Sequence, residues 1–161
     1  MRTVIICSGE IYDYSYCLDI VKSADRIICA DGGTRHAKNM NLVPDTIIGD
    51  MDSSEPENIE FFEEKGIEVI KYPKDKDKTD TQICIEYALS FSKEIILLGA
   101  TGSRIDHVIA NISLLKLGTD RNIPISIVDG NNCIRLIKDS IVLHGNKGDY
   151  FSLIPFTERV E

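Results

Sequence analysis

The sequence contains no tryptophan and no long apolar run, and it is short of positive charge. Its 18 lysine and arginine residues face 26 aspartate and glutamate residues, which gives a formal net charge of −8. Polyanionic partners, such as nucleic acids and anionic membrane surfaces, usually require a basic face. No apolar run approaches the roughly 20 residues of a membrane-spanning helix. We therefore expect neither a nucleic acid nor a membrane as a partner.

The five cysteines are an odd number and include no C-x-x-C pair. Cys7, Cys29 and Cys84 lie inside apolar runs, where a free thiol behaves as a small hydrophobic side chain. Unpaired cysteines are typical of reducing compartments, so we expect a cytoplasmic protein. A zinc site is the weaker alternative, because the three histidines lie far from one another and from any cysteine pair.

Apolar, β-branched runs alternate with segments of helical periodicity along most of the chain. Strands are expected at Thr3–Cys7, Arg26–Ala30, Asp45–Ile48, Glu68–Tyr72, Glu94–Leu98 and Ile125–Val128. Helices are expected at Tyr14–Ser23, Thr34–Met40, Pro56–Lys65, Thr81–Phe91 and Asp106–Leu117. This alternation predicts an α/β domain over residues 1–128, a Rossmann-like open and mostly parallel sheet with helices on both faces.

The pattern changes after Val128. Short strand-like runs at Cys133–Ile137, Ser140–Leu143 and Tyr150–Ile154 are separated by turn signals. We expect residues 129–161 to be the first strands of a small antiparallel β domain. Three strands are few for an independent sheet, so the chain is expected to stop before that domain is complete.

Two aspartates follow the predicted strand Asp45–Ile48, in the run Gly49-Asp50-Met51-Asp52-Ser53. On an extended segment, residues two apart point to the same side, so Asp50 and Asp52 can face one cation. The carboxyl end of a strand is also where open α/β sheets bind ligands. The alternative is a surface turn with solvated acids, since D-x-D is a common pattern.

The run Lys76-Asp77-Lys78-Thr79-Asp80-Thr81 precedes a predicted helix. With Thr79 as the helix cap, Asp80 lies in the first turn, where the helix dipole favours a negative charge. Exposed amides at such a helix start can receive phosphate oxygens, and Lys76 or Lys78 can neutralise developing charge. The alternative is a charged loop followed by an ordinary cap.

Two turns rich in glycine, Asp31-Gly32-Gly33 and Gly99-Ala100-Thr101-Gly102, each follow a strand and precede a helix. Glycine lets the backbone approach a ligand closely, although in such turns it is often only a geometric requirement. Beyond the second turn, Arg104 has a planar guanidinium suited to phosphate oxygens. His107 is more often an ordinary polar residue than a catalyst.

All of these segments are expected at the carboxyl edge of one parallel sheet. Acidic side chains cannot hold a polyphosphate unaided, so a divalent cation has to bridge them. The sequence therefore predicts a single magnesium–nucleotide site and metal-assisted phosphoryl-type transfer.

In their order along the chain, these motifs resemble the thiamine pyrophosphokinase family. The resemblance rests on Ala30–Gly33, Pro44–Asp45 leading to Gly49–Ser53, Lys76–Asp80, Gly99 through His107, and Ala110–Asn111, and it covers about residues 1–155. It implies an α/β nucleotide domain, a C-terminal β-sandwich and a homodimer. It also implies Mg²⁺-dependent transfer of pyrophosphate from ATP to the hydroxyethyl group of thiamine, giving thiamine diphosphate and AMP.

Position by position, the resemblance implies metal ligation by Asp50, Asp52 and Asp80. It implies ATP contacts at Asp31, Gly32, Gly33, Lys76, Thr79 and Arg104, and we expect further nucleotide contacts at Gly99, Thr101, Gly102 and Asn111. Asp77, Asp106 and His107 receive catalytic or supporting polar roles, with Asp106 as the candidate proton acceptor.

The family's second domain continues past the point where this chain ends, and it supplies much of the thiamine pocket at the dimer interface. We therefore expect the chain alone to bind nucleotide but not to turn over thiamine. Two alternatives remain: another magnesium-dependent phospho- or nucleotidyl-transferase or hydrolase, and a non-catalytic α/β nucleotide-binding module. Release of AMP rather than ADP distinguishes pyrophosphate transfer from the first, and consumption of ATP distinguishes it from the second.

Overall fold

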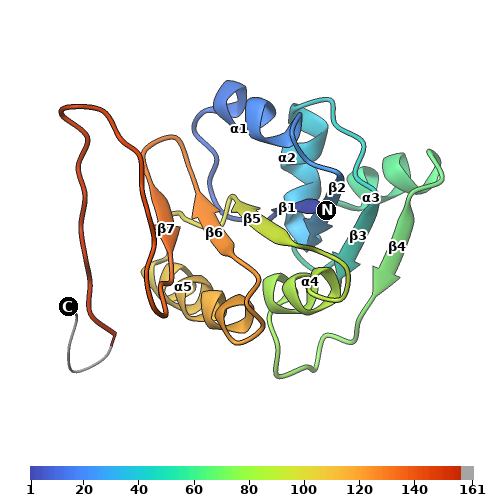
Figure 1. The fold of residues 1–161 in the computed structure, drawn as a ribbon. Coiled ribbons are helices and arrows are strands. Elements are labelled where there is room, and N and C mark those ends of the chain that lie inside the picture. Colours follow the sequence, from blue (N-terminus) through green and yellow to red (C-terminus); the bar gives the residue numbers. More distant parts are fainter. Residues whose placement is uncertain (157–161) are drawn as a thin grey trace.

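A single seven-stranded sheet organises the computed structural model, which describes residues 1–156 (Figure 1). The strands are β1 (Arg2–Ile6), β2 (Arg26–Ala30), β3 (Thr46–Gly49), β4 (Glu68–Lys71), β5 (Glu94–Leu98), β6 (Ile125–Val128) and β7 (Cys133–Arg135). The helices are α1 (Tyr14–Val21), the short 3₁₀ turn η1 (Asp31–Gly33), α2 (Thr34–Asn39), α3 (Pro56–Glu63), α4 (Asp80–Ala88) and α5 (Ile105–Thr119). The strand order is β4-β3-β2-β1-β5-β6-β7, parallel throughout except for β7, which is antiparallel to β6.

Helices cover both faces of the sheet. Successive residues of β1 show this directly, because Ile5 packs with α4 and α5, while Val4 and Ile6 pack with α1, α2 and α3 on the other face. A strand buried on both faces needs apolar residues at every position, which is why the central strands have continuous apolar sequences. The predicted open, mostly parallel sheet is confirmed.

Three predicted strands, at Arg26–Ala30, Glu94–Leu98 and Ile125–Val128, have the observed bounds. The other strands and helices predicted within residues 1–128 are also present, and their ends differ from the prediction by no more than three residues. No helix within residues 1–156 combines the length and the apolar character that crossing a bilayer would require.

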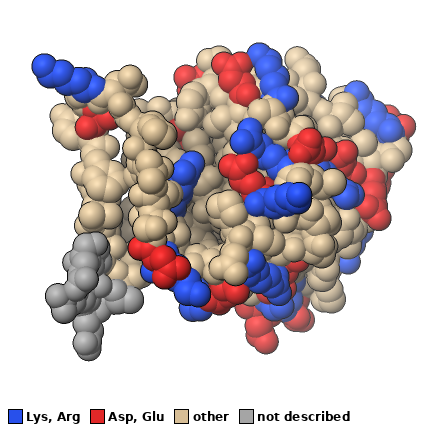
Figure 2. All heavy atoms as spheres, viewed as in Figure 1, with Lys and Arg blue, Asp and Glu red and all other residues tan. Residues whose placement is uncertain are grey.

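The chain after β6 departs from the sequence prediction. Cys133–Arg135 pairs with β6 as the last strand of the main sheet, whereas Ser140–Leu143 and Tyr150–Ile154 form no strand. A strand needs a partner for its backbone, and among the described residues this segment has none. Many of its apolar side chains are exposed, and Figure 2 shows it as a largely uncharged surface beside the mixed charges of the main body. The rest of the predicted second domain, residues 157–161, lies outside the described part.

The strand order reverses between β1 and β5. From β1 the chain adds β2, β3 and β4 on one side, and it then returns to add β5 and β6 on the other. In open α/β sheets, ligands bind outside the carboxyl ends of the strands near such a reversal. The segments that follow β1, β2, β3 and β5 all lie at this edge.

Candidate functional site: three converging carboxylates

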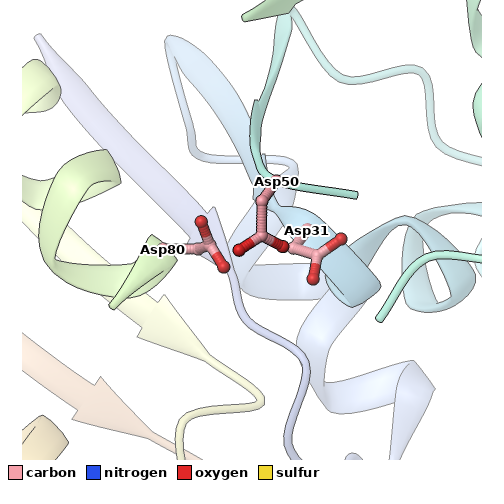
Figure 3. A group of neighbouring side chains, drawn as sticks. All are labelled: Asp31, Asp50 and Asp80. Carbon is pink, nitrogen blue, oxygen red and sulfur yellow. The ribbon is translucent and has the colours of Figure 1, made fainter. Parts of the chain in front are cut away.

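Three aspartates from separate segments meet at the carboxyl edge of the sheet. Asp31 follows β2, Asp50 follows β3 and Asp80 is the first residue of α4. One carboxylate oxygen from each lies within 4.8 Å of the others, and Figure 3 shows the three side chains converging. The Asp31 residue is only 3% exposed, while Asp50 and Asp80 are half-buried. Within residues 1–156 this is the one group of three or more acidic, histidine or cysteine side chains arranged in this way.

Gly49 makes room for this convergence. A Cβ atom at position 49 would lie 2.8 Å from Cβ of Asp31 and 3.2 Å from Cγ of Asp80. Both distances are shorter than ordinary van der Waals contacts. The missing side chain of Gly49 therefore lets the two carboxylates approach each other beside the end of β3.

Asp31 is held in place by the chain that follows β3. Its Oδ2 accepts a hydrogen bond from the Ser53 amide at 3.0 Å, and its Oδ1 accepts one from Oγ of Ser54 at 2.8 Å. Asp31 also has a φ of +41°, in the left-handed region that a residue with a side chain rarely adopts. Such local strain persists only where surrounding contacts fix it, and it is common at functional sites.

The Ser54 contact was not predictable from the sequence pattern. Ser54 lies two residues before the helix that begins at Pro56, but the residue in the cap position is Glu55, which makes no capping hydrogen bond through its side chain. The Ser54 hydroxyl is directed to Asp31 instead, and this links the segment after β3 to the segment after β2.

Lys76 is the cation closest to the group. Its Nζ lies 2.5 Å from Oδ2 of Asp50 and 3.2 Å from Oδ1 of Asp80, and its side chain is only 13% exposed. The hydrogen bond from Lys76 lowers the pKa of Asp50, whereas burial raises the pKa of Asp80 in spite of the same lysine. Burial alone would lower the pKa of Lys76, but its bonds to the two carboxylates outweigh that effect and raise it.

One acceptor of the group has an ion-pair neighbour but no hydrogen bond. Oδ1 of Asp80 is buried and has no hydrogen-bond partner, because Lys76 approaches it at 3.2 Å without hydrogen-bond geometry. A buried carboxylate oxygen without a partner is costly unless something else satisfies it. Three converging carboxylates with such an oxygen fit a hard divalent cation, which takes oxygen ligands.

Asp52 is not part of this group. Its side chain is 40% exposed and lies 3.0 Å from Nζ of Lys74. Asp50 and Asp52 would face the same side only on an extended backbone, but Met51 has a φ of +64° and turns the chain. The Asp52 amide folds back to donate to Oδ1 of Asp50 at 3.1 Å. The structure therefore brings Asp31, and not Asp52, together with Asp50 and Asp80.

The first glycine turn, at Gly32 and Gly33, packs against the chain itself. A Cβ atom at Gly33 would lie 2.0 Å from the Ile6 carbonyl oxygen, and one at Gly32 would lie 2.9 Å from that of Ser53. These glycines let the η1 turn sit directly on the end of β1, and this positions the adjacent Asp31.

The second glycine turn, Gly99–Gly102, is held by side chains on both sides. Gly99 has a φ of +62°, and a Cβ atom there would lie 2.7 Å from the Cys7 carbonyl oxygen. Asn111 donates from Nδ2 to the Ala100 carbonyl at 2.8 Å, and Oγ1 of Thr101 donates to Oδ2 of Asp129 at 3.0 Å. Thr101 and Asn111 thus fix the shape of this loop.

The remaining predicted site residues lie at helix starts. Thr79 caps α4 as expected, accepting a hydrogen bond from the Gln82 amide at 3.2 Å. Asp77 is exposed next to it. Arg104, Asp106 and His107 are exposed at the start of α5, where Arg104 forms an ion pair with Asp106 and lowers the pKa of that carboxyl. None of these side chains belongs to the three-carboxylate group.

Comparisons with known proteins show to which family the chain is similar. Residues 17–127 match the family described as "Thiamin pyrophosphokinase, catalytic domain". The chain is 33% identical over 137 residues to thiamine pyrophosphokinase of Bacillus subtilis, an alignment that covers 83% of this chain and 64% of the relative. It is 34% identical over 110 residues to thiamine pyrophosphokinase 1 of Oryza sativa subsp. japonica, covering 55% and 42% of the two chains.

Solved structures show the same similarity. The thiamin pyrophosphokinase of Geobacillus thermodenitrificans superposes with a TM-score of 0.69 at 30% identity, covering 83% of this chain and 61% of that one. The Bacillus subtilis structure gives a TM-score of 0.70 at 26% identity, with 81% and 61% covered. The chain thus spans about three-fifths of the length of these two Bacillus and Geobacillus relatives. From the family match and the shared fold, the chain belongs to the thiamine pyrophosphokinase family.

Proposed function

We propose that the protein is a thiamine pyrophosphokinase, which transfers the terminal pyrophosphate of ATP to the hydroxyethyl group of thiamine and releases AMP. The observation that carries the proposal is the convergence of Asp31, Asp50 and Asp80 at the carboxyl edge of the sheet, where one buried oxygen of Asp80 has no hydrogen-bond partner. Membership of the family supports the choice of this reaction over other phosphoryl transfers.

Asp31, Asp50 and Asp80 are the residues that would hold Mg²⁺, in place of the Asp50–Asp52–Asp80 set expected from the sequence. They supply oxygen ligands only, as Mg²⁺ prefers. When bound, the ion would neutralise the charge that develops on the transferred phosphates. Asp31 is already held by its two hydrogen bonds, so little order has to be gained at this ligand.

The protein's own contribution to the reaction is mainly position and charge. In the proposal, the thiamine hydroxyl attacks the β-phosphorus of ATP, the bond to the α-phosphate oxygen breaks and AMP leaves. Lys76 and the amides at the start of α4 face the phosphates, and the Gly99–Gly102 loop with Arg104 contacts the nucleotide. Asp106 is a weak base, because Arg104 lowers its pKa, but a loose transition state demands little proton removal from the attacking hydroxyl.

The thiamine pocket, the homodimer and the second domain are further parts of the proposal. The α/β domain extends through β7, and in the proposal the chain beyond it begins the β domain that completes the thiamine site in a dimer. The cytoplasmic location rests on the cysteines, since Cys7, Cys29 and Cys84 are buried as free thiols. Burial raises the pKa of Cys7 to about 12, so this thiol is inert and serves packing.

The test is product analysis with the protein in its natural full length, ATP, Mg²⁺ and thiamine. We expect AMP and thiamine diphosphate in equal amounts, and no AMP when thiamine is omitted. Asp50→Ala is expected to reduce turnover strongly at saturating Mg²⁺. ADP or inorganic phosphate as the product would support a different transferase or a hydrolase, and bound but unconsumed ATP would support a binding module.

A further inference from the structure

We propose that Lys76 is a built-in counter-ion, which occupies the cation position between Asp50 and Asp80 until a divalent ion displaces it toward the polyphosphate. The inference rests on the proposed function, because it requires that the three carboxylates bind a metal. Beyond that function, it gives Lys76 two anionic partners in succession, first the carboxylates and then the polyphosphate. Metal binding and phosphate binding are thereby coupled through one side chain.

The position of the ammonium group supports the first partner. Nζ of Lys76 bridges Oδ2 of Asp50 and Oδ1 of Asp80, two of the three carboxylates that converge. The side chain is largely buried, although its neighbours Asp75 and Asp77 are exposed. An ammonium drawn inward from an exposed loop indicates that the carboxylates form a position suited to a cation.

The ammonium group and a metal ion cannot share these oxygens. A Mg²⁺ ion that ligates Oδ2 of Asp50 at roughly 2.1 Å would stand within about 4.6 Å of Nζ of Lys76, even on opposite sides of the oxygen. At that separation in a partly buried site, the like charges repel strongly. Lys76 carries one charge against three carboxylates, so a divalent ion is the better counter-ion and displaces it.

The second partner follows from where Lys76 is attached. It belongs to the segment between β4 and α4, and three residues later Thr79 caps the start of α4. A phosphate that the metal bridges to Asp80 would lie at this helix start, within reach of a long flexible side chain. The nucleotide therefore receives the displaced ammonium, and each ligand should strengthen the binding of the other.

The test is a titration with Mn²⁺ in the absence of nucleotide, in which electron paramagnetic resonance measures the concentration of the free ion. We expect Lys76→Met to bind Mn²⁺ about tenfold more tightly than the parent protein, because the competing ammonium is gone. Lys76→Arg keeps the charge and should bind as weakly as the parent. Lys78→Met is the matched control, since Lys78 lies in the same segment but pairs with Glu86 at 2.7 Å, and its affinity should be unchanged.

A second titration in the presence of a non-hydrolysable ATP analogue tests the exchange itself. The analogue should raise the Mn²⁺ affinity of the parent protein by a larger factor than it raises the Mn²⁺ affinity of Lys76→Met. The variant has no ammonium group that could move from the carboxylates to the phosphates. Lys76→Gln serves as a second variant if the methionine protein does not fold, as judged by circular dichroism, and the same tighter binding is expected.

The outcomes distinguish the counter-ion role of Lys76 from the proposed metal site. If folded Lys76→Met and Lys76→Gln bind Mn²⁺ no more tightly than a parent protein that does bind it, the counter-ion inference is overturned while the proposed metal site stands. If neither the parent nor any variant binds Mn²⁺, the proposed metal site fails and the inference fails with it.

Discussion

Asp31 and Asp52 are the two carboxylates that compete for the third place in the proposed metal site, and exchanging each for asparagine decides between them. Asparagine keeps the shape of the side chain and removes its charge. Asp31 lies with Asp50 and Asp80, whereas Asp52 is exposed and pairs with Lys74. We therefore expect Asp31→Asn to damage turnover and Asp52→Asn to leave it nearly intact.

The magnitudes follow from the two environments. Removing one preorganised charged group at a site of developing charge costs about 10²- to 10³-fold in kcat, or about 3–4 kcal/mol. The exposed ion pair of Asp52 with Lys74 is worth about 0.2–1 kcal/mol of folding stability, and because Asp52 lies outside the three-carboxylate group, kcat should change little. Asp31→Asn should also lower stability, because both oxygens of Asp31 accept hydrogen bonds and an amide offers only one acceptor.

The assay measures kcat and KM for both variants over a series of Mg²⁺ concentrations, together with the free energy of unfolding without metal. A purely structural loss in Asp31→Asn would lower stability without changing the Mg²⁺ dependence, whereas loss of a ligand shifts that dependence to higher concentration. The assignment of Asp31 as a ligand is refuted if Asp52→Asn loses more activity than Asp31→Asn.

Three further predictions concern the stability of the fold and of the site. Gly49→Ala places a Cβ atom 2.8 Å from that of Asp31, so we expect a loss of about 1–3 kcal/mol in the free energy of unfolding and weaker Mn²⁺ binding. Burial lowers the pKa of His36 in the folded protein, so the neutral side chain contributes its full stability above the unfolded pKa of 6.5. This contribution is lost as the pH falls through the lower folded pKa. Urea titrations from about pH 7.5 to about pH 5 should show the loss of stability, and His36→Gln should make the stability depend less on pH. Thr79→Ala removes the side-chain cap of α4 and should lower the stability by about 1 kcal/mol, as measured by thermal melting.

Sequence reasoning located the elements of the α/β domain because local chemistry determines them. The run at β5 is apolar at every position, and only a strand covered on both faces needs that pattern. The same reasoning was wrong at Ser140–Leu143 and Tyr150–Ile154, whose β-branched and aromatic residues are typical of strands. Pairing is not a local property, and neither segment finds a partner strand within residues 1–156.

The candidate site was only partly predictable for a similar reason. Asp50 and Asp80 could be inferred because each lies next to the end of a recognisable element. The inclusion of Asp31 depends on how β2 and β3 align, and the exclusion of Asp52 depends on the left-handed turn at Met51. Neither the alignment of the two strands nor the turn at Met51 can be inferred from the spacing of residues in the sequence. The hydrogen bond of Ser54 to Asp31 likewise links two segments whose proximity exists only in the folded chain.

The register of β2 against β3 accounts for the site as a whole. Ala30 pairs with Ile48, so the next residue of each strand brings Asp31 alongside Gly49, with Asp50 one step beyond. A Cβ atom at position 49 would lie 2.8 Å from Cβ of Asp31 and 3.2 Å from Cγ of Asp80. A side chain at position 49 would push Asp31 and Asp80 apart, so the glycine is part of what lets the three carboxylates converge.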